Sequence, residues 1–539
     1  MFKGSPKSLP ATPSWCARLC IALLLALGVA LSLAQSSDVA GIYGPDVSDE
    51  AQTGGEIIVG LVYEPPALDP IHQQADATTA LTVLMYQGLV YTDWDSDVQP
   101  LLATDWTVSD DGLTYTFNIR EGVKFHDGSD LTAADVKYSY DYLRDPSSGG
   151  AGSVYLNAID EIVVVDDYTV EIRLSSPNSA ILAGLDNKLS GIFPEGYWET
   201  PNAQAMLNQQ SVGTGPFMLE EFLPNQSITL VRNPDYWQPG VPYLEAITFV
   251  SVPDGNSLLN GLRTERIDLS LLARPQDSEQ LTGIDGLNIE EQVSWVQKSI
   301  DLQAGAGVTA NEQVRQAIAL AIDKEQILQA AVQGYGAVIG LMPAGMQDRW
   351  GVPLDELPNQ GPDIERAQEL LTEAGYPDGL DVKITTIIGY DWMTPAAETL
   401  AAQLARVGIN ATIERQDLGV WINNWGARSF TDITFNDWGT IPDPSLLFDA
   451  HFQMLPVGND FRNWENEQAT ELLTLAKQAT GYEERHEYYA QVQELMAESA
   501  PTVPLFSSYI VAVSQDYVRN YDQHPSGWYF GLIKTWLDD

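Results

Sequence analysis

The chain has 539 residues, of which 44% are hydrophobic and 9% aromatic, and its formal net charge is -47 at pH 7. This length exceeds what one hydrophobic core usually holds, so two or three domains are expected, and the composition excludes a globally disordered chain. The strong negative charge argues against a nucleic-acid partner, because long-range repulsion opposes that encounter.

The N-terminal segment has the pattern of an export signal. Lys3, Lys7 and Arg18 precede an apolar run that ends with Ala34. The run is short for a membrane span but suits a signal-peptide core, so we expect residues 1–34 to be a signal peptide. An uncleaved N-terminal anchor is the alternative.

The two cysteines limit what the mature chain can contain. Cys16 and Cys20 both lie before the apolar run, so the mature chain has no disulfide and no cysteine for lipid attachment. Residues 35–53 are small and polar without periodicity, which predicts a flexible leader. We therefore expect a periplasmic or extracellular protein without a lipid anchor.

The first predicted strand is followed by a rigid loop. Residues 56–63 form a near-continuous apolar run that is typical of a buried strand. Pro65 and Pro66 prevent a helix at this point. The strand therefore delivers Tyr63 and Glu64 on a stiff loop.

A β-rich stretch with one helix comes next. Residues 114–120 alternate as in a half-buried strand, and residues 161–174 predict a hairpin with an aspartate pair at its turn. Between them, Thr132 with Asp135 three positions later predicts a capping box that starts a helix.

After residue 300, helices and strands alternate, which predicts right-handed crossovers and a parallel sheet. The expected elements are two successive helices within 311–334, the second capped by Asp323 and ended by Gly334; a helix capped by Asp363 and closed by Gly375; a strand over 381–388; a helix from Thr394 to about Val407; and strands over 410–416 and 432–437.

The C-terminal part predicts a return of the chain. A long helix over 482–500 stops before Pro501, and residues 503–514 read as a buried strand. If this strand rejoins the N-terminal sheet, the chain crosses between domains near residue 298 and near residue 503. Two such crossings form a hinge.

Motifs for covalent or metal chemistry are missing from the sequence. None of the five histidines has a second histidine or cysteine at ligand spacing, and Ala490 stands where a zinc-protease helix that starts at His486 needs its second histidine. A nucleophile elbow, a phosphate-binding loop and a dinucleotide fingerprint are absent too. We expect no catalytic residue, no metal and no cofactor.

Aromatic and acidic residues gather instead in loops that follow predicted strands. In open α/β sheets ligands bind at the carboxyl ends of the strands, so we expect the loops at 63–64, 389–392 and 438–444 to form one crevice, which Trp421 and Trp425 can join. The candidate ligand-binding residues are Tyr63, Glu64, Trp392, Asp437, Trp438, Gly439, Thr440 and Asp443.

Several longer segments carry a family resemblance. They include PLLATDWTVSDDGLTYTFNIREGVKFHDGSDLTAADVKYS from residue 100, GTGPF from 213, VRQAIALAIDKEQI from 314 and WGTIPDP from 438. From residue 54 onwards the chain resembles the extracellular solute-binding proteins of ABC importers, family 5, the dipeptide, oligopeptide and nickel type. The resemblance implies an α/β, two-lobed periplasmic-binding-protein-like fold of type II, with an extra β-rich subdomain in the first lobe.

The resemblance also implies boundaries and partners. Lobe I is expected at 54–297 with the subdomain at about 80–205, lobe II at 298–502, and a return segment at 503–539 that completes lobe I. Such a protein captures a peptide or similar polar solute by closing its lobes and presents it to a membrane permease, without enzymatic activity. We expect a monomer.

One position departs from the family pattern. Similar peptide-binding members usually carry an aspartate between the Trp-Gly pair and the Asp-Pro pair, where it binds the peptide's ammonium group. This chain has Thr440 and Ile441 there and is one residue shorter. Because an unpaired buried charge costs several kcal/mol, we hypothesise that the ligand does not depend on a free amino terminus.

Three alternatives stay open at this point. The same fold could bind an oligosaccharide, or a signalling partner could replace the permease. A protein of another class, a secreted hydrolase, would need Asp437 and Asp443 as an acid–base pair.

Overall fold

The computed structural model describes residues 51–538, apart from 74, 95, 187–190, 440–442, 449–451, 453, 455–458 and 480. The expected signal peptide and most of the expected leader lie outside the described residues. None of the described helices combines the length and the apolar character that crossing a bilayer requires.

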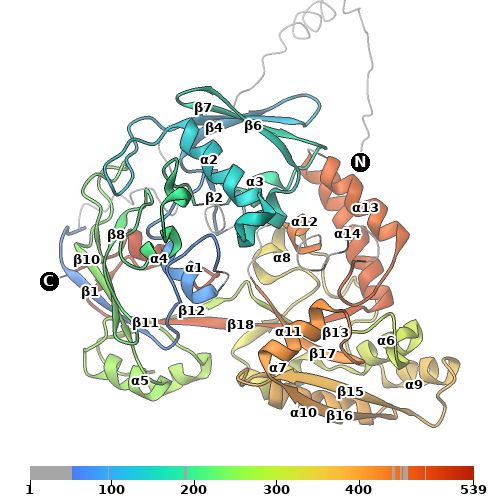
Figure 1. Cartoon of the computed structure of the whole chain (residues 1–539). Helices are drawn as coiled ribbons and strands as arrows, with labels where there is room; N and C mark the ends of the chain where they lie inside the picture. The colour runs from blue at the N-terminus through green and yellow to red at the C-terminus, as the bar shows by residue number, and fades with distance from the viewer. Residues whose placement is uncertain are drawn as a thin grey trace, which may run out of the picture. The chain divides into compact units, whose positions relative to one another are not determined.

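A mixed twelve-stranded sheet runs through the described chain (Figure 1). In sheet order its strands are β16 (Ile409–Gln416), β15 (Leu380–Ile387), β17 (Ile433–Trp438), β13 (Gln297–Leu302), β18 (Thr502–Gln515), β11 (Leu269–Leu271), β1 (Glu56–Leu61), β10 (Ala246–Ser251), β9 (Ser227–Arg232) and β8 (Phe217–Leu223), while β12 (Leu287–Val293) and β14 (Gly336–Val338) also pair with β18.

The return strand β18 joins two groups of strands. Its residues 502–506 pair with β13, and its residues 509–515 pair with β12. It also pairs with β11, which is the parallel neighbour of β1. The prediction that this strand rejoins the N-terminal sheet is therefore confirmed. β18 runs between the group containing β1 and the group containing β13 and β17 (Figure 1).

The second strand group has the predicted parallel order. β15 pairs in parallel with β16 over its whole length and with β17 at two positions. Helix α10 (Met393–Ala405) connects β15 to β16, and α11 (Leu418–Gly426) connects β16 to β17. The carboxyl ends of β15 and β17 therefore lie at one edge.

Most predicted helix caps are confirmed. Asp323 accepts the Gln326 N–H at the start of α7 (Lys324–Val332), and Asp363 accepts the Arg366 N–H at the start of α9 (Ile364–Glu373). At the end of α7, Gln333 and Gly334 both have positive φ, and the predicted stop of the helix at Gly334 is confirmed. The other helices between β13 and β18 in the chain are α6 (Glu312–Ala321), α8 (Ala344–Trp350), α12 (Pro444–Leu446), α13 (Glu467–Gln478) and α14 (Tyr482–Ser499).

Two details of the chain between β13 and β18 differ from the sequence-based expectation. Helix α10 begins at Met393 rather than at Thr394, because burial of Trp392 and Met393 fixes its first turn against the core. Helix α11 was not predicted, since its glycines and asparagines are poor helix formers. The rings of its two tryptophans, Trp421 and Trp425, stack with their centroids 5.5 Å apart and give the helix a packed face.

The β-rich subdomain contains a separate antiparallel sheet of four strands. Its order is β4 (Ala103–Val108), β5 (Thr114–Ile119), β7 (Thr169–Leu174) and β6 (Ile159–Asp166). Helix α2 (Ala133–Arg144) packs beside it, and the predicted capping box is present: the Thr132 N–H donates to Asp135 Oδ2 at 2.8 Å. The predicted hairpin β6–β7 is confirmed. The remaining elements are α1 (Asp76–Thr82), α3 (Ile181–Gly184), α4 (Ala203–Met206), α5 (Gly255–Arg263) and the pairs β2 (Val90–Thr92) with β3 (Val98–Pro100) and β19 (Val518–Arg519) with β20 (Trp536–Leu537).

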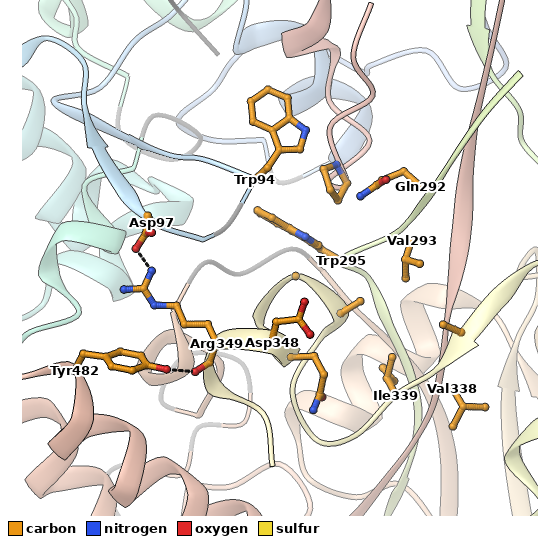
Figure 2. Close-up of a pocket in the computed structure, with 15 residues that line it drawn as sticks. Trp94, Asp97, Gln292, Val293, Trp295, Val338, Ile339, Asp348, Arg349 and Tyr482 are labelled. Atoms are coloured by element: carbon orange, nitrogen blue, oxygen red, sulfur yellow. Dashed lines mark hydrogen bonds and ion pairs between the residues drawn. The ribbon is translucent and has the colours of Figure 1, made fainter. Parts of the chain in front are cut away.

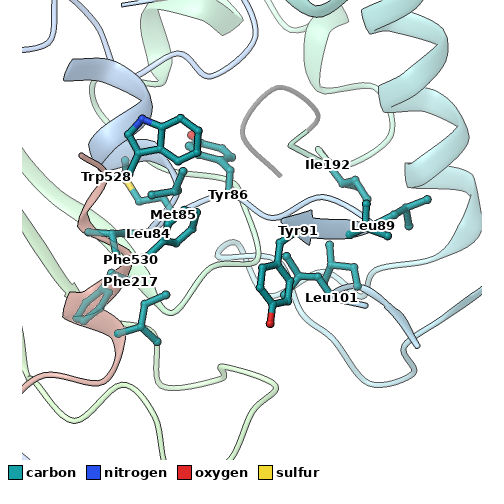
Figure 3. Close-up of a cluster of buried hydrophobic side chains, with 14 of the residues drawn as sticks. Leu84, Met85, Tyr86, Leu89, Tyr91, Leu101, Ile192, Phe217, Trp528 and Phe530 are labelled. Carbon is teal, nitrogen blue, oxygen red and sulfur yellow. The ribbon is translucent and has the colours of Figure 1, made fainter. Parts of the chain in front are cut away.

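The C-terminal segment packs into the core of the N-terminal half. Trp528 and Phe530 lie against the side chains that follow α1, among them Leu84 and Met85 (Figure 3). The GTGPF turn closes the same region, since a Cβ on Gly213 would lie 2.1 Å from the Met85 carbonyl oxygen. Burial of these aromatic side chains holds the chain end against the segment that follows α1.

Candidate ligand-binding site

A cavity of about 400 Å³ lies where several strands end. Residues 60–63 and 271–273 line it from the carboxyl ends of β1 and β11, and Asp437 lines it from the carboxyl end of β17. Residues 508–510 of β18 contribute where that strand passes between the two strand groups. Ligands of open α/β sheets bind at this edge, so the cavity is the candidate site.

An ion pair spans two of the strands in this cavity. Lys298 on β13 and Asp437 on β17 face each other in the antiparallel ladder, and Lys298 Nζ donates to the two carboxylate oxygens at 3.1 and 3.4 Å. Their side chains are 9% and 23% exposed. Lys298 is the one cation among the described residues that line this cavity, and Asp76 on α1 supplies a second carboxylate.

Trp392 supports this ion pair from the core. Its ring is buried and packs edge-on against Phe435 and Phe506, at centroid distances of 5.5 and 5.6 Å. Lys298 Nζ lies 5.1 Å from the centre of the same ring, which attracts the ammonium group. Trp392 is thus placed behind Lys298 and is not among the lining residues.

Tyr390 brings the third predicted loop close to the same charges. Burial raises the pKa of its phenol, and the carboxylates of Asp437 and Asp76 raise this pKa further. The loops that follow β1, β15 and β17 therefore approach one another here, although the 389–392 loop reaches the charges without lining the cavity.

The two residues predicted on the first loop take different positions. Tyr63 is 71% exposed and lines the cavity. Glu64 turns away, since its carboxylate accepts the Asn225 N–H at 2.9 Å and the Ser251 hydroxyl. Glu64 thereby ties the loop to its neighbouring strands.

Asp443 is held inside the fold by a helix cap and an ion pair of its own. It is buried, it accepts the Ser445 N–H at 2.8 Å as the cap of α12, and it accepts two hydrogen bonds from Arg485 Nη2 at 2.8 and 2.7 Å. Burial by itself lowers the pKa of Arg485, but Asp443 outweighs it and holds this pKa above its usual range. Asp437 and Asp443 are bound to different cations, so this geometry gives no support to a hydrolytic acid–base pair.

The remaining predicted residues lie at the end of β17. Trp438 is the last residue of the strand and pairs through its backbone with Gln297, and Gly439 follows it, half-buried. The Trp438 side chain and Thr440 lie outside the described part of the chain. Their contacts with a ligand stay predictions.

Sequence reasoning missed Asp76, Lys298 and the aromatic residues Tyr509 and Trp528 of this cavity. Lys298 had one usable signal, because a crossing of the chain between domains had been expected near that residue. Asp76 had none, since an aspartate in the first turn of a helix is ordinary. Over the residues that the structure describes, no group of three or more histidine, cysteine or acidic side chains could hold a metal ion.

The comparisons with known proteins agree with this architecture. Residues 97–456 match the family described as bacterial extracellular solute-binding proteins, family 5 Middle, and the chain belongs to this family. Among relatives, the glutathione-binding protein GsiB of Salmonella typhi is 27% identical over 478 residues, which covers 85% of this chain and 90% of that protein.

Two solved structures support the same family assignment. The periplasmic binding protein DppA of Helicobacter pylori in complex with the peptide STSA is 26% identical, with a TM-score of 0.77 over 91% of this chain and 99% of that chain. A dipeptide-binding protein of Pseudoalteromonas in complex with Met-Leu is 25% identical, with a TM-score of 0.75 over 90% of this chain and 100% of that chain. The fold is the two-lobed type II fold, and the chain is a substrate-binding protein of the ABC-importer kind.

Proposed function

We propose that the protein captures a short peptide in the cavity beside Lys298 and Asp437 and delivers it to the permease of an ABC importer. The relatives named for glutathione, for STSA and for Met-Leu support a peptide ligand. A volume of about 400 Å³ suits a small ligand. The same proposal includes an export signal at the N-terminus, a location outside the cytoplasmic membrane and a monomeric state.

The ion pair inside the cavity is the observation that carries this proposal. A peptide brings a carboxylate at its C-terminus, and Lys298 is the cation that the described lining residues offer to it. The ammonium group keeps donor capacity beyond its bonds to Asp437. Lys298 therefore binds the ligand carboxylate, while Asp437 and Trp392 fix the position of Lys298.

Closure of the two lobes is the proposed mode of capture. The chain passes between the strand groups at 294–296, between β12 and β13, and at 507–508 within β18. Residues of both passages line the cavity. A ligand there contacts both lobes, and it shifts the equilibrium because it binds the closed form better than the open form.

Isothermal titration calorimetry tests the role of Lys298. The probes are glutathione and a tripeptide, the latter with a free and with an amidated C-terminus. We expect the free tripeptide to bind, and amidation or Lys298→Met to weaken it about tenfold or more, because one charge-assisted hydrogen bond is lost. Amidation should cost nothing further in the Lys298→Met protein.

The control is Lys383→Met, which removes an exposed lysine paired with Glu414 on β15 and β16. It should bind the tripeptide like the natural chain. Equal affinity of the natural protein for free and amidated peptides would contradict the role of Lys298. Failure of every peptide and of glutathione to bind would contradict the proposed ligand class.

A further inference from the structure

The predicted β-rich subdomain touches helices α8 and α13 at two places besides the chain passages at 294–296 and 507–508. At the first place, the Ser179 N–H donates to the Lys477 carbonyl oxygen at 2.9 Å, and Ser179 Oγ donates to the Ala476 carbonyl oxygen at 3.4 Å. At the second place, Asp97 and Arg349 form an ion pair (Figure 2). Both contacts therefore join the subdomain to helices that lie beyond the first passage along the chain.

The Ser179 contact completes the end of a helix. Ala476 and Lys477 belong to the last turn of α13, where carbonyl groups have no partner within the helix. Ser179 and Ala476 are 297 positions apart in the chain, so only the fold brings the donor to this helix end. The subdomain therefore caps α13 from outside the helix.

Ser179 is presented by a turn that is anchored on the four-stranded sheet. The Asn178 side chain accepts the Ala180 N–H at 3.1 Å, which closes the turn around Ser179. The Asn178 carbonyl oxygen accepts the hydroxyl of Tyr115 on β5 at 3.4 Å. The donor groups of Ser179 therefore keep a fixed direction relative to β5 and move with the subdomain.

The apolar part of this contact is small. Ala180 and Ala183, at the start of α3 and within it, are 1% and 4% exposed, and they pack into a hydrophobic cluster whose other buried members lie, among the described residues, between 341 and 497. Tyr155 packs beside them and is partly buried. An alanine side chain buries little apolar area, and parts of a chain that share only a small interface can move apart.

The ion pair between Asp97 and Arg349 borders a cavity of about 890 Å³ (Figure 2). Asp97 lines this cavity from the subdomain, whereas residues 337–339 and several residues of α8 line it from beyond the first passage. The two surfaces therefore enclose space near the pair instead of packing closely. The side chains of Asp97 and Arg349 are 48% and 32% exposed, and ion pairs that water reaches in this way contribute little to stability.

We propose that Ser179, Ala180 and Ala183, together with the ion pair between Asp97 and Arg349, form a latch that is made when the two lobes close and broken when they open. This inference rests on the proposed capture of a peptide by lobe closure. None of the latch residues is among the described residues that line the peptide cavity. The latch therefore changes peptide affinity only through the equilibrium between the open and closed forms, in favour of the closed form.

Every contact of the latch is weak, which suits a joint that must reopen to release its ligand. The hydrogen bonds from Ser179 exchange for bonds to water when the lobes separate, the alanines expose little apolar area, and the ion pair is already partly hydrated. A large apolar interface would hold the lobes shut without a ligand. Weak contacts leave the decision to the ligand and lengthen its stay once it is bound.

Two variants that act on the latch in opposite directions test this proposal, each made in the full chain with Cys16→Ser and Cys20→Ser. Ala183→Glu adds a carboxylate that the closed form buries and the open form exposes to water, so it should hold the latch open. Ser179→Cys with Lys477→Cys places two thiols across the 2.9 Å backbone hydrogen bond, and a disulfide formed with diamide should hold the latch closed. In small-angle scattering without ligand, Ala183→Glu should have a larger radius of gyration than the oxidised pair.

Each variant has a matched control. Ser176→Glu adds the same charge at an exposed position of the same loop, outside the latch, and the reduced form of the cysteine pair controls for the two substitutions. Both controls should have the radius of gyration of the natural chain. The free energy of unfolding in urea should be equal for Ala183→Glu and Ser176→Glu, because the open form accommodates the new carboxylate.

Equal radii of gyration for Ala183→Glu and the oxidised pair overturn the latch. A lower free energy of unfolding for Ala183→Glu, with the radius of gyration of the natural chain, overturns it too, because that result identifies a permanent contact of the fold.

Peptide release links the latch to transport. In stopped-flow experiments a tripeptide should dissociate about tenfold faster from Ala183→Glu than from the natural chain, and more slowly from the oxidised pair than from the reduced pair. Unchanged dissociation rates together with different radii overturn the effect of the latch on the ligand. Failure of the natural chain to bind any peptide contradicts the proposed function alone, because the comparison of radii uses no ligand.

Discussion

Asp437 and Asp443 lie six positions apart and look alike in the sequence, but the structure gives them opposite surroundings. Asp437 is the last residue but one of β17, borders the cavity and pairs with Lys298, and its side chain is 23% exposed. Asp443 caps α12 and pairs with Arg485, and both side chains of that pair are 10% exposed. The difference separates a carboxylate that meets the ligand site from one that holds the fold.

The contrast follows from what each aspartate is attached to. Asp437 belongs to a sheet edge where the ladder ends, so its carboxylate can be reached from the cavity. Asp443 starts a helix that packs among buried aromatic residues, where an ionised carboxylate persists only when cations and N–H groups surround it. Solvent access, more than distance along the chain, decides which of the two carboxylates can reach the cavity.

Removal of Arg485 should have the largest effect on stability. Arg485→Met leaves Asp443 buried without its cation, which typically costs about 3 to 5 kcal/mol. The free energy of unfolding in urea measures the loss. Arg173→Met, which breaks an exposed pair with Glu171 in the subdomain, is the control and should leave stability unchanged. A loss from Arg485→Met no greater than that of the control would refute the structural role of the pair.

Removal of Lys298 should destabilise the protein less than removal of Arg485. Lys298→Met leaves Asp437 without its cation, but water partly reaches this carboxylate. We therefore expect the free energy of unfolding to fall by about 1 to 2 kcal/mol in the same urea experiment. The double variant Lys298→Met, Asp437→Asn removes both charges and should recover most of this loss. If Lys298→Met proves as costly as Arg485→Met, the two pairs do not differ as described.

A third aspartate, on the strand that also carries Lys298, sharpens the comparison through pH. Asp301 on β13 is buried, and burial raises the pKa of its carboxyl to about 6 although Arg462, 4.0 Å away, lowers it. The folded state thus binds a proton more tightly than the unfolded state. Its contribution to stability is fully present below the unfolded pKa of about 4 and is lost as pH rises through about 6.

Asp301→Asn should flatten this part of the pH profile. Thermal unfolding between pH 4 and pH 7 should show a smaller decline for the variant than for the natural chain, because the amide does not titrate. Asp381→Asn, at an exposed site on β15, is a control that keeps the decline. Parallel profiles for the natural chain and Asp301→Asn would contradict the assignment.

The smallest expected effect concerns the peptide's amino group. Asp443 is buried and paired with Arg485, Asp437 is paired with Lys298, and Thr440 and Ile441 stand where peptide-binding relatives usually carry the ammonium-binding aspartate. N-acetylation of the tripeptide should therefore change its affinity by less than about tenfold, measured by calorimetry. Binding restricted to peptides with a free amine would identify an ammonium anchor and refute the hypothesis drawn from Thr440 and Ile441.

Local rules predicted much of the fold from the sequence. The caps at Asp323 and Asp363 and the capping box at Thr132 depend on residues a few positions apart, and β18 was evident from its length and apolar character. Helix α11 escaped prediction because a stacking contact between tryptophans stabilises it against its own propensities. Tertiary packing overrides local preference in such elements.

The site was predictable only in its position. The carboxyl ends of the strands indicated the edge at which the cavity lies, and Tyr63 and Asp437 line the cavity there. The burial of Trp392 and the outward turn of Glu64 depend on neighbours far along the chain, such as Phe506 and Ser251. Lys298 and Asp437 are more than a hundred residues apart, and only the pairing of β13 with β17 brings them together.

A crystal structure of the protein with a bound tripeptide tests the central claim most directly. We predict electron density for the peptide in the cavity between Tyr63 and Asp437, with its terminal carboxylate within hydrogen-bond distance of Lys298 Nζ. Peptide density found only elsewhere on the protein would contradict the claim.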